Sequence, residues 1–457
     1  MTNTLVRDFD RLCSSIPDLS TLEFEGTGVW GGATVQLSQD GTWVAHWTSG
    51  RSPVADRFDE VVLKSAHGSL IITKAVVTSR HFPGPVEGMY ISAKLIPAGA
   101  DSGGDSSCRR ANVLKLDTPF FDFLHVHGFV VDSTPMQRPS RSWLPVSTPL
   151  GDIHIYYLHT CKLLFIESEL PVTEDDFDRC VFAIRLLLTY LTKAPLLGSS
   201  QWVAFADNGD LQHVEWRASG RTSPRPRMYR PIPSDWSEWG RVLDNFNLDF
   251  SETPLPSTMF SGMVQRLLDK PGTMAPIEYI LAAYEQMLEL RGALLSVAIE
   301  SMAELLRRDG LMQSKKPLPD EVWDSVCHSL QDALVREVAS EPDAQRILVS
   351  RIKNLNSPTN KDKLLGGFMA LDVQLTEDEI AAVDQRNTLL HTGRLGSKAS
   401  ADGWRGKYVM EMRLLTAINK LLLSYLGYSG PVIDWGAKES TTGAGSYVWV
   451  GKREARE

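Results

Sequence analysis

Apolar and polar residues alternate with a period of two over much of the first 255 positions, which is typical of β-strands. The clearest case is Ala33–Leu37, which a turn at Gln39-Asp40-Gly41 joins to Thr42–Trp47. This arrangement predicts a β-hairpin. The same pattern predicts further strands at Val61–Lys64, Ser69–Val77, Gly88–Ile96, Val113–Leu116, Phe120–Val131, Ile153–Leu158, Leu163–Ser168, Trp202–Ala206 and His213–Arg217. We therefore expect a β-rich, sandwich-like or barrel-like domain.

One helix is predicted within this strand-rich half. Thr173 precedes three acidic residues, and a hydroxyl followed by acids in the first turn is a typical helix start. Apolar residues then recur at helical spacing until Lys193-Ala194-Pro195, at Phe177, Val181, Ile184, Leu188 and Leu191.

After Ser257 the apolar period becomes helical almost throughout. A long helix is predicted from Ile277 to Leu306, in which Gly292 marks either a break or close packing. A second runs from about Asp320 to Ser340, with Val322, Val326, Leu330, Leu334 and Val338 expected to face inward. Two more follow Pro342 and carry Ile347, Leu348, Ile352 and Leu355, then Leu364, Leu365, Phe368 and Leu371. The last runs from about Trp404 to Leu426. This half is expected to be an all-α bundle.

The change of period predicts an α+β protein with two domains, at 1–256 and 257–430, and a C-terminal tail at 431–457. Between Gly220 and Pro256, prolines and arginines cluster, most densely in Arg221–Arg230. This segment is either an exposed linker or a basic strip that contacts RNA or an acidic partner.

Composition narrows the class of protein. The chain has 457 residues, 43% hydrophobic and 23% charged, which is typical of soluble globular proteins. The net charge of −9 means that any contact with nucleic acid must be local. Five scattered cysteines indicate reduced thiols, and neither a signal peptide nor a membrane-spanning stretch is predicted. We expect a cytoplasmic protein without a membrane partner.

The most informative stretch lies near the end of the helical half. Thr376-Glu377-Asp378-Glu379 has the form of a capping box, and it opens a helix that carries Arg386, Asn387 and His391 and can end at Gly393. Arginine offers a fixed fork for phosphate oxygens, and histidine can transfer a proton near neutral pH. Positions 387 and 391 share a helix face, whereas 386 and 391 differ by about 140°.

Two interpretations of this stretch remain open. The carboxylate cluster that a magnesium nuclease needs is missing from the sequence nearby, which favours cleavage of RNA without metal by attack of the 2′-hydroxyl. His391 would then move protons and Arg386 would stabilise charge on phosphorus. Alternatively, Arg386 and His391 are ordinary cations near a helix C-terminus, and the helical domain is a non-catalytic dimerisation or binding module.

Residues 274–430 resemble a HEPN domain, the all-α module whose ribonuclease members carry R-x4-6-H, often with a polar residue after the arginine. Arg386-Asn387-Thr388-Leu389-Leu390-His391 fits that form. Ala298–Ser301, Arg351–Asn356 and Leu423–Tyr428 are similar to other parts of the domain. A β-rich domain before such a module is similar to the ApeA-like abortive-infection proteins of anti-phage defence.

The resemblance implies a metal-independent endoribonuclease that acts on tRNA, rRNA or mRNA, without a cofactor, as a homodimer or larger oligomer with a composite site. It makes Arg386 and His391 essential and Asn387 an orienting residue, with Glu300 as an acid near the site. It also implies an N-terminal domain that restrains the nuclease until a phage-derived trigger arrives. A local excess of cations could supply an RNA-binding surface, at Arg394, Lys398, Arg405, Lys407 and Arg413 against Asp402 and Glu411.

A second constellation lies in the strand-rich half. His125 and His127 share one strand face, and His159 and Cys161 do the same, so the four could bind zinc or be isolated side chains. The sequence contains no P-loop, no GxSxG and no Cys–His protease pattern.

Overall fold

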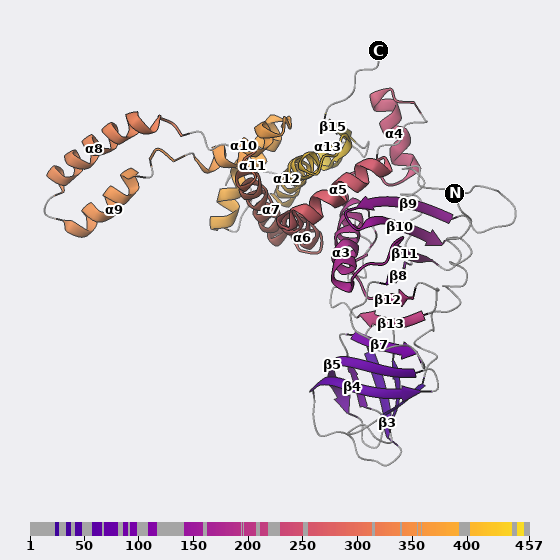
Figure 1. The fold of residues 1–457 in the computed structure, drawn as a ribbon. Helices are drawn as coiled ribbons and strands as arrows, with labels where there is room; N and C mark the ends of the chain where they lie inside the picture. Colours follow the sequence, from indigo (N-terminus) through magenta and orange to yellow (C-terminus); the bar gives the residue numbers. More distant parts are fainter. Residues whose placement is uncertain are drawn as a thin grey trace. The chain divides into compact units, whose positions relative to one another are not determined.

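The chain divides into two compact units. The computed structural model describes residues 23–26, 33–37, 42–47, 57–65, 68–80, 86–89, 92–97, 108–116, 141–158, 162–192, 194, 196–206, 211–217, 229–249, 255–312, 316–338, 341–353, 355–357, 359–392, 403–440 and 446–451. Unit 1 comprises Met1–Met274 and Leu426–Pro431, and unit 2 comprises Ala275–Tyr425 and Val432–Glu457. Strands dominate the first and helices the second (Figure 1), which confirms the predicted α+β class.

Unit 1 is built on one antiparallel sheet of thirteen described strands. These are β1 (Glu23–Gly26), β2 (Ala33–Leu37), β3 (Thr42–Trp47), β4 (Arg57–Ser65), β5 (Gly68–Arg80), β6 (Val86–Met89), β7 (Ser92–Pro97), β8 (Arg109–Lys115), β9 (Arg141–Thr148), β10 (Gly151–Leu158), β11 (Leu163–Ser168), β12 (Ser200–Phe205) and β13 (Leu211–Arg217). The predicted hairpin is β2–β3, and its partners Val35 and Ala45 lie opposite one another.

The first six strands close on themselves. The pairing order is β1–β2–β3–β6–β5–β4, and β4 also pairs with β1. Alternate residues point into this ring and are buried, as Val35, Trp43, Leu63 and Ile72 show. The barrel-like expectation therefore holds for this part of the sheet, because period-two alternation gives each strand one apolar face.

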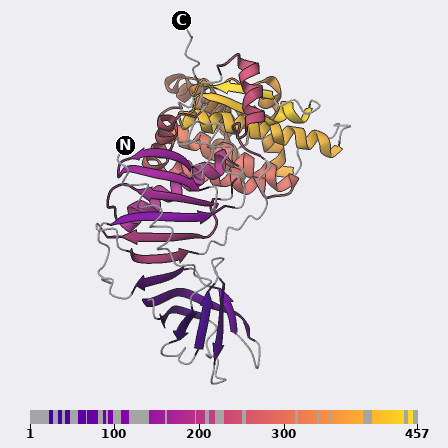
Figure 2. The same cartoon turned by 90° about the vertical axis from the view of Figure 1, so that its right-hand side faces the viewer.

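The long strand β5 extends the sheet beyond the ring. It pairs with β7, after which the order is β13, β12, β8, β11, β10 and β9 (Figure 2). The single helix predicted here is α3 (Glu174–Leu191), and the Thr173 hydroxyl accepts a hydrogen bond from the Asp176 N–H at 3.3 Å. The region predicted as one strand, Gly88–Ile96, is divided between β6 and β7, and Phe120–Val131 lies outside the described residues.

Two helices follow the sheet within unit 1. The predicted linker contains α4 (Trp236–Phe246), in which Trp239 and Val242 are buried. Next comes α5 (Ser257–Asp269), which packs against β9 and α3 and is followed by the short η3 (Pro271–Thr273). The units therefore divide after Met274, whereas the sequence placed the boundary after 256.

Unit 2 is a helical bundle with a small sheet. Its elements are α6 (Met274–Tyr284), α7 (Leu288–Arg308), α8 (Asp320–Glu337), α9 (Pro342–Lys353), α10 (Asn360–Ala370), α11 (Glu377–Thr392), α12 (Gly403–Tyr425), β14 (Gly430–Asp434), α13 (Trp435–Ser440) and β15 (Ser446–Val450). The helix α12 packs against α7, α11 and α13. A Cβ atom at Gly367 of α10 would lie 2.8 Å from Leu306 Cδ1 of α7, so any larger residue there would force the Leu306 side chain to shift.

Two helix predictions need correction. The long helix predicted over 277–306 is divided into α6 and α7 at Glu285–Met287 rather than at Gly292. The N–H groups of Glu285 and Gln286 bond to carbonyls three residues back, which ends α6 in a tight turn. On α8, Val322, Val326 and Leu330 were expected to face inward but are exposed. That helix packs against α9 with a neighbouring stripe instead.

Candidate active site

The helix that carries the R-x4-H motif starts as the sequence predicts. The Glu379 carboxylate accepts the Thr376 N–H at 2.8 Å, and the Thr376 hydroxyl accepts the Glu379 N–H at 3.2 Å. These two reciprocal bonds form the capping box, which satisfies backbone donors that the first turn of a helix leaves free. The start of α11 is thereby fixed.

A buried ion pair attaches this start to α12. The Lys420 ammonium lies 2.7 Å from Glu379 Oε1 and also donates to the Gln374 carbonyl at 3.3 Å. Both charged side chains are less than 5% exposed. A second pair between the same helices, Arg413 with Asp378 at 2.7 Å, is much more exposed. The capped end of α11 therefore has one buried and one surface attachment.

The motif lies in the second half of α11, which runs to Thr392. The backbone at positions 386, 387 and 391 is helical, as predicted, while their side chains and Gly393 lie outside the described residues. Positions 386 and 391 of a single helix differ by about 140° around its axis.

A buried acid that sequence reasoning missed lies on α12, which packs against α11. Glu411 on α12 is fully buried, and its carboxylate is 3.9 Å from Nε of Arg291 on α7. Near the other end of the same two helices, the Tyr425 hydroxyl donates to Asp309 at 2.6 Å, so α7 and α12 run parallel. The capped start of α11 meets the same helix α12 at Lys420.

Glu411 could have been noticed in the sequence. It precedes Leu415 by four residues and Ile418 by seven, so it occupies the apolar stripe of its helix. An acid in such a stripe is buried and needs a cation. Sequence reasoning instead counted Glu411 among the surface charges.

The other predicted site residues are dispersed. Glu300 lies on the exposed side of α7, Arg405 is exposed, and Lys407 is half-buried. Arg394 and Lys398 lie outside the described residues. The predicted excess of surface cations therefore changes in two opposite ways. The pairing of Arg413 with Asp378 neutralises one cation, and the burial of Glu411 removes one acid from the surface.

The last residues of the Arg221–Arg230 segment are neither an exposed linker nor a basic strip that could contact RNA. Arg230 is 2% exposed, forms an ion pair with Glu238 and also lies 3.4 Å from Asp235. Tyr229 is buried as well. Arg230 thus holds the start of α4 and is unavailable to RNA, whereas 221–228 lie outside the described residues.

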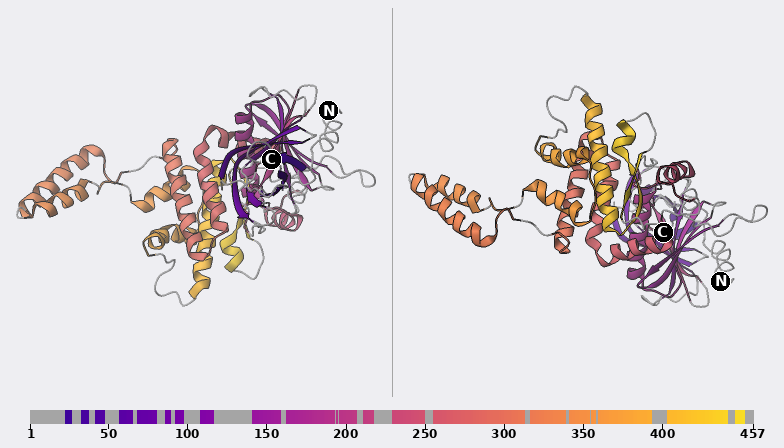
Figure 3. Two further views of the ribbon diagram at one scale, coloured as in Figure 1. Left: turned by 90° about the horizontal axis from the view of Figure 1, so that it is seen from below. Right: turned by 90° about the horizontal axis from the view of Figure 1, so that it is seen from above.

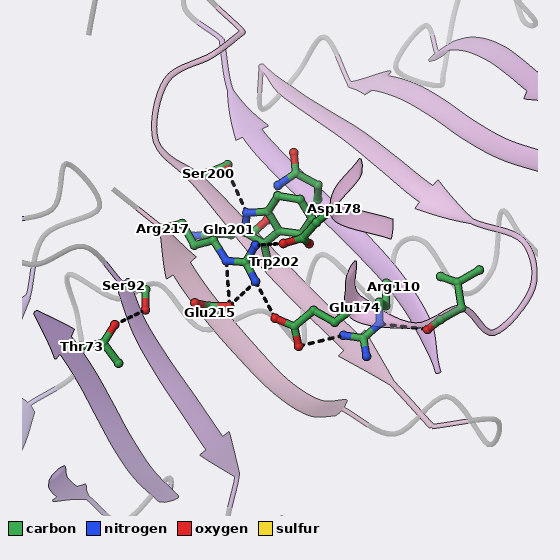
Figure 4. Close-up of polar contacts among 12 residues, drawn as sticks. Thr73, Ser92, Arg110, Glu174, Asp178, Ser200, Gln201, Trp202, Glu215 and Arg217 are labelled. Carbon is green, nitrogen blue, oxygen red and sulfur yellow. Dashed lines mark hydrogen bonds and ion pairs between the residues drawn. The ribbon is translucent and has the colours of Figure 1, made fainter. Parts of the chain in front are cut away.

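Unit 1 contains a polar network of its own, centred on Arg217 of β13 (Figure 4). The Arg217 guanidinium lies 4.4 Å above the Trp202 ring and forms ion pairs with Glu174 at 2.6 Å, Glu215 at 2.7 Å and Asp178. Burial raises the pKa of Asp178, against the opposing effect of Arg217. The network attaches the first turns of α3 to the sheet, which is a structural role.

His213 lies beside this network. Burial lowers the pKa of His213 to about 4, and Lys94, Arg110 and Arg217 act in the same direction while Glu174 opposes them. The imidazole is therefore neutral at physiological pH. The predicted zinc ligands His125, His127, His159 and Cys161 lie outside the described residues. Among the residues that are described, no cluster of three or more potential metal ligands occurs.

Comparison of the chain with protein-family models, with curated proteins and with solved structures finds no match. Within the described part of the chain, no helix has the length and apolar character needed to span a membrane.

Proposed function

We propose that this protein is a metal-independent endoribonuclease of the HEPN type. The proposal rests on α11, a capped helix in the helical unit. This helix contains Arg386, Asn387 and His391 at the R-x4-H spacing. In this mechanism the RNA 2′-hydroxyl attacks the adjacent phosphorus, His391 transfers protons, and Arg386 stabilises the developing negative charge. Asn387 orients the reacting groups.

Two copies of the motif would form one composite groove in a homodimer, because positions 386 and 391 of a single helix diverge by about 140°. Arg394, Lys398, Arg405 and Lys407 would contact RNA phosphates, and Glu300 would act from outside the site. The strand-rich unit would restrain the nuclease until a phage-derived signal arrives, in an abortive-infection response.

The experiment is incubation of purified wild type and His391→Ala with bacterial RNA in EDTA, followed by analysis of product ends. Cleavage by wild type alone, leaving 2′,3′-cyclic phosphates and 5′-hydroxyls, is the expected result. The variant should lose at least ~100-fold in rate, which is the low end of a general acid–base contribution.

Lys398→Ala is a useful companion variant, since it removes one proposed phosphate contact without touching the motif. It should weaken RNA binding modestly and leave the product ends unchanged. Equal cleavage by wild type and His391→Ala would refute the assigned role of His391. If both stay inactive with and without lysate from phage-infected cells, the non-catalytic binding module becomes the better account.

A further inference from the structure

The side chains of Trp143 and His154 join the strands β9 and β10. The strand β9 is the last described strand of the sheet, whose twist fans the strands out when it is viewed along its length (Figure 3). The Trp143 Nε1–H donates a hydrogen bond of 3.1 Å to Nδ1 of His154 on β10. The centroids of the two rings are 5.7 Å apart, and His154 is 5% exposed. This bond therefore holds β9 in addition to its backbone pairing with β10.

The hydrogen bond fixes the protonation state of His154. An indole N–H can only donate, so Nδ1 must present its lone pair and the ring proton must lie on Nε2. A protonated imidazole is a donor at both nitrogens. Uptake of a second proton would therefore set the Nδ1–H of His154 against the indole N–H. The bond exists only while His154 is neutral.

Burial and the neighbouring charges act on His154 in opposite directions. Burial has the largest effect and lowers the pKa of His154 below its ordinary value of 6.5. Glu169, directly after β11, and Asp152 of β10 oppose this effect, whereas Arg109 of β8 adds to it. The Glu169 carboxylate lies 3.6 Å from Nε2, which is longer than an ordinary hydrogen bond. The imidazole is therefore mostly neutral at pH 7.

Two further ionisable side chains lie on the same face of the sheet. Glu167 is opposite His154 in the β10–β11 pair and forms an ion pair with Arg109 at 2.5 Å. The Tyr156 ring lies 6.0 Å from the His154 ring, and burial raises the pKa of Tyr156, so its phenol is neutral. Neither side chain therefore adds a net charge beside the imidazole.

We propose that Trp143 and His154 form a pH-sensitive switch on β9, in which the neutral imidazole holds the indole and acidification releases it. The imidazolium then turns to the Glu169 carboxylate, which already lies at ion-pair distance from Nε2. The helix α5 packs against β9, and its Ser261 hydroxyl accepts the Ser147 N–H, so loosening of β9 extends to this contact. The switch lies within unit 1 and is independent of ribonuclease activity.

Indole signals in the NMR spectrum of the full-length protein test the switch. The chain has 12 tryptophans, and the spectrum of Trp143→Phe identifies the Nε1–H signal of Trp143 by its loss. As pH falls from 7, this signal should move upfield, toward the position of an indole without the bond, with a midpoint below pH 6.5. Circular dichroism at each pH should show that the chain is still folded.

Substitutions at position 154 separate the proton from the bond. His154→Asn keeps an oxygen acceptor near the place of Nδ1 and cannot be protonated, so the Trp143 signal should stay at its neutral-pH position. His154→Phe retains a ring without an acceptor, so the signal should lie near its low-pH position throughout. His213→Gln is the matched control, because burial also lowers the pKa of His213, and Trp143 should titrate in it as in wild type. Glu169→Gln should move the midpoint to lower pH.

Hydrogen exchange of Arg141–Thr148 tests the release of the strand. Below the midpoint, exchange corrected for the intrinsic effect of pH should rise roughly 2- to 10-fold in wild type, the effect of losing one hydrogen bond, and should not rise in His154→Asn. The proposal is wrong if the Trp143 signal keeps its position down to the pH at which the whole chain unfolds, or if it titrates equally in His154→Asn. Unchanged exchange of β9 below the midpoint would refute the release of this strand.

Discussion

At the residue scale, three cationic side chains show how differently a positive charge can act in this chain. Arg230 and Lys420 are both nearly inaccessible, yet each meets a carboxylate that also caps or begins a helix. Arg217 is more open and serves three carboxylates at once. Buried charges require partners because desolvation is costly. These residues therefore fix helix starts, so under the proposed function only surface cations could contact RNA.

His213 makes the stability of unit 1 depend on pH. Its folded pKa of about 4 lies below the ordinary value of 6.5, so the unfolded chain takes up the proton first as pH falls. The stabilisation is complete above the unfolded pKa and is lost as pH falls toward 4. Between pH 7 and 5 the free energy of unfolding should drop by roughly 1–2 kcal/mol because of this group.

The measurement is urea denaturation of wild type and His213→Gln at both pH values. The glutamine variant should show a smaller pH dependence, since it cannot be protonated. His46→Gln is the matched control, because His46 is an exposed histidine of the same unit. An unchanged pH dependence in His213→Gln would show that other groups cause the acid sensitivity.

The residues of the candidate site could be predicted only in part. The spacing of Arg386, Asn387 and His391 and the capping box are local features, and the helix they predict is present. Glu411, Arg291 and the Lys420–Glu379 pair depend on how three helices pack, and periodicity does not specify which stripes meet. The surface positions of Glu300 and Arg405 follow from the same packing.

At the element scale, α11 is attached to α12 by a buried pair and an exposed pair, which permits a controlled comparison. Lys420→Met leaves the Glu379 carboxylate buried without its cation and should lower the stability of unit 2 by about 3 kcal/mol. Arg413→Met removes the exposed partner of Asp378 and should cost under ~1 kcal/mol.

Chemical denaturation followed by circular dichroism distinguishes the two variants. Both changes remove one positive charge from α12, so net charge is matched. If the RNase proposal holds, Lys420→Met should also reduce cleavage, since it loosens the helix that carries the motif. Equal stability of the two variants would mean that the Lys420–Glu379 pair contributes little beyond its desolvation cost.

Elements with local signals were predictable, and elements without them were not. The β2–β3 hairpin and the Thr173 cap have local signals in the sequence, and the strand pairing and the cap are both present. The break at Glu285–Met287 has no glycine or proline, so the chain reads as one helix through it. The helix α4 was hidden because the prolines before it resemble a linker. Tertiary packing decides such cases over local preference.

At the scale of the whole molecule, the division after Met274 assigns α5 to the strand-rich unit. The apolar spacing of α5 predicts a helix but does not say what it covers, so sequence alone placed it with the other helices. Phe260, Met263, Val264 and Leu267 are all fully buried. Each such side chain is worth about 1.5–3 kcal/mol of burial.

Two fragments test this assignment. Residues 1–274 retain α5, and residues 1–256 lack it. The longer fragment should unfold cooperatively on heating, whereas the shorter should be less stable by several kcal/mol or aggregate. Thermal denaturation monitored by circular dichroism gives the comparison. A fragment 1–256 as stable as 1–274 would show that α5 contributes nothing to the sheet.

The contact of α5 with β9 also bears on how the chain is synthesised. At one end the sheet closes through the β4–β1 pairing, and at the other β9 is the last described strand. Pro145 within β9 has no N–H to offer, and the Ser147 N–H donates to the Ser261 hydroxyl of α5 at 3.1 Å. An uncovered edge strand invites pairing with another chain. On the ribosome, β9 emerges more than a hundred residues before Ser261, so nascent chains on one polysome carry open edges until α5 is made.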